Sequence, residues 1–193
     1  MTYHFVNLVS WKFFSENVSD RQIIKVDSLS LQFMCFLFGR RVKRISGVHY
    51  FNNSIESFEV FYLTSSIYKS NSYFVLPFWR KIEDIELTDD LIFAIKQNEK
   101  LVIGISSPKQ DKLAELIISR FPDKAVYCLG AAIYTNDKAN WYDRHGLSWL
   151  FLMIQDWRRF VTKISLTLIS AGRILFISSE RNAFKKFLQN LSD

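Results

Sequence analysis

Short apolar runs rich in β-branched and aromatic residues alternate with helical segments through the first 130 residues. Such runs are typical of buried strands. Strands that alternate with helices favour an α/β fold, with a mainly parallel sheet flanked by helices. The predicted strands are Tyr3–Val9, Gln22–Val26, Glu59–Thr64, Tyr73–Leu76, Lys100–Ile105 and Ala125–Leu129, with Lys43–Ile45 as a further short strand or edge.

Helix-terminating residues help to define three helices between these strands. An apolar helix over Ser28–Phe38 ends at Gly39, a residue that favours the position just after a helix. An amphipathic helix covers Asp89–Gln97. The third predicted helix runs from Pro108 to Arg120, with Ser106 or Ser107 as its N-cap.

Small or polar residues follow several of the predicted strands. In open parallel sheets, ligands gather at the carboxyl ends of the strands. The pattern therefore predicts a binding site formed by residues at these ends, namely Asp27, Thr64, Ser106 and Gly130.

Composition supports a folded chain with one core domain. Hydrophobic residues make up 49% and aromatic residues 16% of the 193 residues, which excludes a disordered chain. No Gly/Ser-rich or Pro-rich linker interrupts the chain. We expect a core domain over 1–140 and a C-terminal appendage over 141–193.

The charge is positive and uneven. The net charge is +6, and the segment from Trp141 onward holds eight Lys/Arg against four Asp/Glu. A basic appendage suits an anionic membrane face, a pyrophosphate lipid or nucleic acid, although a solvated surface explains it equally well. Since no nucleic-acid-binding motif is present, we expect no nucleic-acid partner.

Neither cysteine has a metal-ligand neighbour at the usual spacing, and the three histidines are scattered. We therefore predict no metal site and reduced, buried thiols at Cys35 and Cys128. The N-terminal residues do not resemble a secretion signal, so we expect a cytoplasmic protein.

Six segments occur in an order that resembles the WecG/TagA/CpsF family of bacterial glycosyltransferases. The strand–loop–helix segment Leu101–Leu113 (LVIGISSPKQDKL) is similar to the family's G-x-G-x-P-K-Q-E signature. The other five are Val26–Leu31 (VDSLSL), Arg44–Gly47 (RISG), Cys128–Ala132 (CLGAA), Gly146–Leu150 (GLSWL) and Asp156–Arg159 (DWRR). The resemblance covers about four fifths of the chain, from Asn7 to Arg159.

The resemblance implies a Rossmann-like fold and an inverting sugar transfer that needs no metal or cofactor. The implied donor is a UDP-sugar, such as UDP-N-acetylmannosamine or a derivative, and the acceptor is linked to undecaprenyl diphosphate. The family's proposed general base matches Asp27, which would take the proton of the acceptor hydroxyl.

The resemblance also implies a set of substrate-binding residues. Arg44 would pair with a diphosphate, and Gln110 would bind sugar or phosphate at a helix N-terminus. Structural roles stay open beside these: Asp27 as a helix N-cap, Gln110 as an exposed residue, Asn7 in a turn, and Arg44 as a surface residue. The full predicted set is Asn7, Arg44, Ser106, Lys109, Gln110, Gly130 and Arg159.

Several positions depart from the family pattern. Ser28 replaces a glycine, Tyr134 and Ser148 replace acidic residues, and Leu152 replaces an arginine. These changes keep a second hypothesis open, in which the protein is a non-catalytic member that assists a partner transferase. A homo-oligomer is also compatible with the many aromatic residues.

The apolar run Ile164–Ile177 is too short to span a bilayer. Aromatic residues before it, including Trp157 and Phe160, interleave with Arg158, Arg159 and Lys163. Such a mixture is typical of an element that lies on an anionic membrane, although an element packed on the core fits as well. With the family resemblance, this predicts a peripheral protein at the inner face of the plasma membrane.

Overall fold

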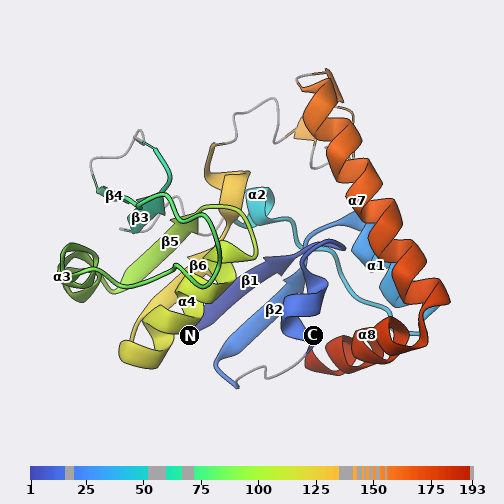
Figure 1. Cartoon of the computed structure of the whole chain (residues 1–193), viewed down its shortest axis with the longest axis horizontal. Helices are drawn as coiled ribbons and strands as arrows, with labels where there is room; N and C mark the ends of the chain where they lie inside the picture. The colour runs from blue at the N-terminus through green and yellow to red at the C-terminus, as the bar shows by residue number, and fades with distance from the viewer. Residues whose placement is uncertain are drawn as a thin grey trace. The chain divides into compact units, whose positions relative to one another are not determined.

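Six strands form one parallel sheet in the order β2-β1-β6-β5-β3-β4 (Figure 1). This computed structural model describes residues 1–15, 20–51, 60–66, 72–134, 141–142, 145, 147, 150, 153–154 and 156–191. The strands are β1 Thr2–Val6, β2 Gln22–Val26, β3 Phe61–Thr64, β4 Tyr73–Val75, β5 Lys100–Gly104 and β6 Ala125–Cys128. The sheet and its flanking helices confirm the predicted α/β, Rossmann-like class.

The inner strands owe their position to continuous apolar runs. In β5, every residue from Leu101 to Gly104 is buried, as expected for a parallel strand covered on both faces. The predicted strand at Lys43–Ile45 is reduced to a single parallel bridge between Arg44 and Val26. This short edge ties the segment after the first helix to β2.

Three helices, α1, α3 and α4, lie close to their predicted positions, and the structure adds α2, α7 and α8. The helices are α1 Leu29–Leu37, α2 Gly47–Tyr50, α3 Asp89–Gln97, α4 Lys109–Arg120, α7 Trp157–Phe176 and α8 Ser178–Asn190, with 3-10 turns η1 Trp11–Phe14 and η3 Gly130–Tyr134. Gly39 has φ +81°, which confirms the predicted glycine stop after α1.

The predicted capping of α4 is wrong. Pro108 itself occupies the N-cap position, and no side chain caps the helix. The Ser107 hydroxyl donates to Asp111 instead, and Ser106 contributes only its backbone carbonyl, which accepts the N–H of Gln110 at 3.3 Å. The buried Asp111 carboxylate therefore accepts the Ser107 hydroxyl, which was expected to cap the helix.

The chain divides into two compact units. The first unit comprises Met1–His4, Asp20–Ile23 and Tyr50–Tyr134. Its core lies between β3, β5, β6, α3 and α4 and includes Leu63, Leu91, Ile103, Leu113 and Ile117.

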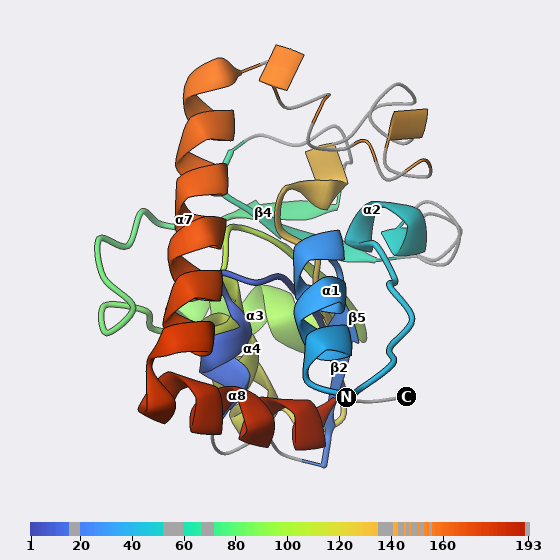
Figure 2. The same cartoon turned by 90° about the vertical axis from the view of Figure 1, so that its right-hand side faces the viewer.

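The second unit comprises Phe5–Ser19, Ile24–His49 and Thr135–Asp193. Its buried core includes Phe14, Ile24, Leu31, Ile174, Phe184 and Phe187. Figure 2 shows α8 running across one end of α7. Because α8 shares this core with η1 and α1, the division differs from the expected boundary at residue 140.

Candidate functional site

The loops after β5 and β6 bring Gln110 and Gly130 together in the first unit. Gly130 has φ +57°, and a Cβ at this position would lie 3.5 Å from Gln110 Oε1. Gln110 is only 5% exposed, and its Oε1 has no hydrogen-bond partner among the residues that the structure describes. The interpretation of Gln110 as an exposed first-turn residue is therefore wrong.

An unpartnered buried acceptor is costly, by about 1–3 kcal/mol, unless a ligand or water satisfies it. Gln110 also lies in the first turn of α4, where free backbone N–H groups favour anions. The pair of features suits a ligand that combines a hydroxyl or N–H donor with a phosphate.

Lys109 and Ser106 flank this position in different ways. The Lys109 ammonium donates to the carbonyl of Trp79 and lies 5.4 Å from the ring centre of Phe78. The Ser106 side chain is exposed. Lys109 is thus held by the loop before α3, whereas Ser106 presents its hydroxyl to solvent near the start of α4.

Beneath this loop lies a buried polar cluster that sequence reasoning missed. His4 Nδ1 lies 2.9 Å from Asp111 Oδ1, and the Ser107 hydroxyl donates to Asp111 Oδ2. His4 is paired in register with Cys128 of the neighbouring strand β6. The signal was hard to find because His4 and Asp111 are 107 positions apart.

Among the described residues, His4, Asp111 and Cys128 form the one group whose potential metal-ligand atoms all lie within 4.8 Å of one another. Burial and the nearby Asp111 raise the pKa of Cys128 well above its ordinary value, so the thiol stays protonated. Both Asp111 oxygens already accept hydrogen bonds. In this structure these side chains form a hydrogen-bonded cluster, which ties β1 to the first turn of α4.

Asp27 follows β2 in the second unit, where it contacts the segment Arg44–Gly47. Its Oδ1 accepts the backbone N–H of Gly47 at 2.9 Å. Its backbone carbonyl accepts Nε of Arg44 at 2.6 Å. The two motif segments VDSLSL and RISG therefore lie side by side, and Arg44 is fixed next to the half-buried Asp27.

Asp27 is not the N-cap of α1. The cap is Ser28, whose hydroxyl accepts the N–H of Leu31 at 3.2 Å. Ser28 thus has a clear local role at the position where the family pattern has glycine. Because the cap is supplied by Ser28, the Asp27 carboxylate does not serve the helix terminus.

Asn7 forms the turn between β1 and η1. Its Oδ1 accepts the N–H groups of Val9 at 2.8 Å and of Ser10 at 3.1 Å. This is the turn-forming role that the sequence left open, and it occupies the side-chain oxygen. Asn7 belongs to the second unit, as do Asp27 and Arg44.

The remaining predicted positions lie wholly or partly outside the residues that the structure describes. Arg159 lies in α7, but its side chain lies outside the described residues, as does that of Tyr134. Ser148 and Leu152 also lie outside the described residues. The described site residues therefore form two groups: Ser106, Lys109, Gln110 and Gly130 in the first unit, and Asn7, Asp27 and Arg44 in the second.

Helix α7 has an exposed apolar stripe. Val161, Ile164, Leu168 and Leu175 recur at helical spacing, and all four are exposed. In the part of the chain that the structure describes, no single helix is long and apolar enough to cross a membrane. The segments Phe160–Phe176 and Ser178–Asn190 reach that length and apolar composition only when taken together, and the chain bends by 100° between them.

The two residue groups are compatible with particular chemical roles, but they do not identify a related protein. A held carboxylate beside an arginine fits proton transfer near a phosphate, and a buried free amide oxygen fits ligand binding. The chain matches no protein-family model, no curated protein and no solved structure.

Proposed function

We propose that the protein is an inverting glycosyltransferase that moves a sugar from a UDP-sugar to a lipid-diphosphate-linked acceptor. The observation that carries the proposal is the contact between Asp27 and the segment Arg44–Gly47. It combines an oriented carboxylate with a guanidinium held near it. A transfer to a lipid-diphosphate sugar needs these two groups, one for the hydroxyl proton and one for the diphosphate.

The proposed reaction is a single displacement. Asp27 accepts the proton of the acceptor hydroxyl while that oxygen attacks the anomeric carbon of the donor sugar. The bond from this carbon to the UDP oxygen breaks, and UDP leaves with the bonding electrons. Attack opposite the leaving group inverts the anomeric centre. The N–H of Gly47 orients the Asp27 carboxylate for the proton transfer.

The donor is proposed to bind at the loops after β5 and β6. A hydroxyl or N–H of the nucleotide sugar would donate to Gln110 Oε1, and the first turn of α4 would favour its diphosphate. Gly130 borders this position, and its φ of +57° is a backbone conformation that L side chains rarely adopt. The family resemblance suggests an N-acetylmannosamine-type donor.

The acceptor is a membrane lipid under this proposal, so the protein would work at the membrane surface. The exposed apolar stripe of α7 and the exposed Arg158 and Lys163 suit an anionic bilayer face. We propose peripheral association with the inner face of the plasma membrane, in the synthesis of a cell-surface polysaccharide.

A UDP-release assay tests this function. Purified protein is incubated with a panel of UDP-sugars and a lipid-diphosphate-sugar acceptor. We expect release with one donor and a loss of at least about 100-fold in Asp27→Asn, which keeps the shape and removes the base. Gln110→Ala should raise KM for the donor. Lys112→Ala, an exposed position on the same helix, is the matched control.

One observation favours the non-catalytic alternative. Lys109, which the resemblance assigns to substrate, is engaged by Trp79 and Phe78 instead. Folded protein that releases no UDP with any donor, yet increases the rate of a partner transferase, would support that alternative. UDP release that persists in Asp27→Asn would support the transferase function but refute Asp27 as its general base.

A further inference from the structure

Helix α1 exposes an unusually apolar face. Leu29, Phe33, Phe36 and Leu37 are 49–59% exposed, whereas Leu31, Met34 and Cys35 on the other face are buried in the core of the second unit. The nine-residue helix contains no charged side chain. A contiguous exposed apolar surface of this kind marks a binding surface more often than an ordinary solvated one.

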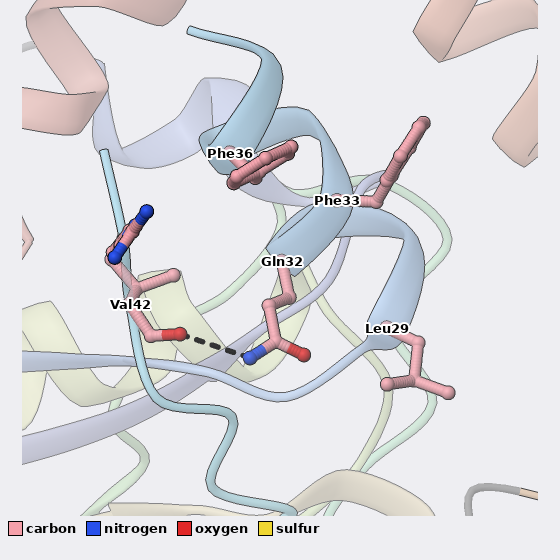
Figure 3. Close-up of a pocket in the computed structure, with 6 residues that line it drawn as sticks. Leu29, Gln32, Phe33, Phe36 and Val42 are labelled. Atoms are coloured by element: carbon pink, nitrogen blue, oxygen red, sulfur yellow. Dashed lines mark hydrogen bonds between the residues drawn. The ribbon is translucent and has the colours of Figure 1, made fainter. Parts of the chain in front are cut away.

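This face forms one side of a groove of about 580 Å³ (Figure 3). Leu29, Phe33 and Phe36 line it from α1, and Arg41 and Val42 line it from the returning chain. Gln32 Nε2 donates to the Val42 carbonyl at 2.9 Å, as the dashed line in Figure 3 shows. This bond holds the two sides together without a ligand.

The segment after α1 that contains Arg41 and Val42 is also held by hydrogen bonds to the end of α8. The Arg40 guanidinium donates to the carbonyls of Leu188 and Leu191, where α8 ends. Gly39 makes the turn that brings this segment back along α1. The groove is therefore preformed, which reduces the entropy that a ligand loses on binding.

The groove has a basic edge, and no acidic residue lines it among the residues that the structure describes. Arg41 lines it, Lys43 is exposed next to it, and Arg44 is bonded to the carbonyl of Asp27. The apolar wall starts at Leu29, two positions after Asp27. An apolar channel with cations along one edge is complementary to an amphiphile that carries a phosphate headgroup.

We propose that this groove binds the hydrocarbon chain of the acceptor lipid, and that the adjacent basic segment binds its diphosphate. The identity of the headgroup rests on the proposed function. This placement directs the diphosphate and its sugar toward Asp27. Since nine helical residues span only about 14 Å, the groove covers the part of a long isoprenoid chain next to the headgroup.

A second copy of the chain fits the groove less well. A self-complementary contact through this surface would bring Arg41 and Lys43 of both copies together, and like charges oppose such pairing. The described groove residues supply no acidic side chain to offset that repulsion. A lipid diphosphate supplies both the apolar part and the negative charge.

A binding experiment without any sugar donor tests the proposal directly. Farnesyl diphosphate, farnesol and inorganic pyrophosphate are titrated separately into the full chain by calorimetry. We expect farnesyl diphosphate to bind tightest, because only it fills the groove and meets the basic edge. The combined change Phe33→Ser and Phe36→Ser should weaken its binding at least about tenfold. Arg41→Gln should weaken it several-fold.

The matched control is Phe93→Ser, which removes an equally exposed phenylalanine from α3 in the first unit. It should leave farnesyl diphosphate binding unchanged. All variants should keep the wild-type unfolding midpoint, because the altered side chains are exposed. Equal losses in Phe93→Ser and in the groove variant would overturn the proposal.

Further outcomes separate this inference from the proposed function. If the groove variant weakens farnesyl diphosphate binding but no UDP is released with any donor, the groove assignment stands and the transferase fails. If UDP release and lipid binding are both unaffected by the groove variant, the transferase stands and the groove assignment is refuted. If the variant dissociates a dimer and leaves lipid binding intact, the groove is a self-association surface.

Discussion

Asp111 concentrates the polar interactions in the core of the first unit. It is almost fully buried, and its two carboxylate oxygens accept from His4 and Ser107. A buried carboxylate is tolerated only when such partners replace water. The cluster therefore stabilises the first turn of α4, which contains the buried Gln110.

Removing the His4 side chain should show how much the stability of the protein depends on the hydrogen bonds of Asp111. We expect His4→Ala to lower the free energy of unfolding by about 3 kcal/mol, because Asp111 would keep its burial and lose a hydrogen bond. Urea denaturation measures the change. Lys112→Ala, which removes an exposed pair with Glu115 on the same helix, should cost about 0.5 kcal/mol or less. Similar losses in the two variants would contradict the role of His4.

A second residue-scale prediction concerns pH. Glu180 Oε1 accepts from Lys12 and from Arg173 at 2.8 Å each, and the hydrogen bond from Lys12 is the main cause that lowers the pKa of Glu180 below its ordinary 4.5. Since the folded-state pKa is lowered, this stabilisation is present above pH 4.5 and is lost as the pH falls through the lowered value.

Glu180→Gln should therefore lower the free energy of unfolding by about 1 kcal/mol at neutral pH. The difference from wild type should shrink as the pH falls below about 4.5. Chemical denaturation at a series of pH values measures both curves. A difference that grows on acidification would show that Glu180 is not stabilised as its carboxylate.

At the scale of elements, two glycines should have opposite effects on stability, one just after α1 and one inside α7. Gly39 follows α1 with φ +81°, a left-handed conformation that other L-residues adopt at a cost. Gly172 lies inside α7, where glycine loses more conformational entropy than alanine does. A Cβ at either position would have no heavy atom within 4 Å, so only backbone effects distinguish the two sites.

Alanine substitution at the two glycines should change stability with opposite signs. We expect Gly39→Ala to destabilise the protein by about 1 kcal/mol and Gly172→Ala to stabilise it by up to about 1 kcal/mol. Thermal unfolding followed by circular dichroism compares the two variants. Stabilisation by Gly39→Ala would show that the turn after α1 does not need its left-handed residue, and would weaken the assignment of a preformed groove.

At the scale of the whole molecule, the exposed stripe of α7 links the fold to its proposed place of action. The stripe consists of Val161, Ile164, Leu168 and Leu175, and Leu168 is 67% exposed. Ser170 on the opposite face donates to the carbonyl of Leu8 and accepts from the Trp11 indole. One face of α7 is thus held by its own unit, and the other is exposed, which is why we propose it as the face that contacts the bilayer.

Vesicle binding tests this surface. We expect the protein to sediment with vesicles that contain anionic lipid, and Val161→Ser combined with Leu168→Ser to reduce the bound fraction several-fold. Added salt should weaken binding, because the basic residues contribute electrostatically. Phe93→Ser should bind like wild type. A bound fraction that is indifferent to the stripe variant would exclude α7 as the membrane-contacting helix.

Local sequence determined the elements of this protein because their signals act over a few residues. Short apolar runs located the strands β2 and β5, and Gly39 marked the end of α1. Polar residues at strand ends predicted a site at Asp27 and Ser106, and both residues do follow strands, β2 and β5. Capping was less certain, since Ser28 and Asp27 compete for one position and only the surrounding contacts select between them.

Only the tertiary structure decided which residues far apart in the sequence contact one another. Asp27 meets Gly47 across 20 positions, His4 meets Asp111 across 107, and α8 packs with η1 across most of the chain. The buried Gln110 lies beside Gly130, which follows a different strand. Such pairings arise when distant segments jointly bury apolar surface, and no periodicity within one segment encodes them.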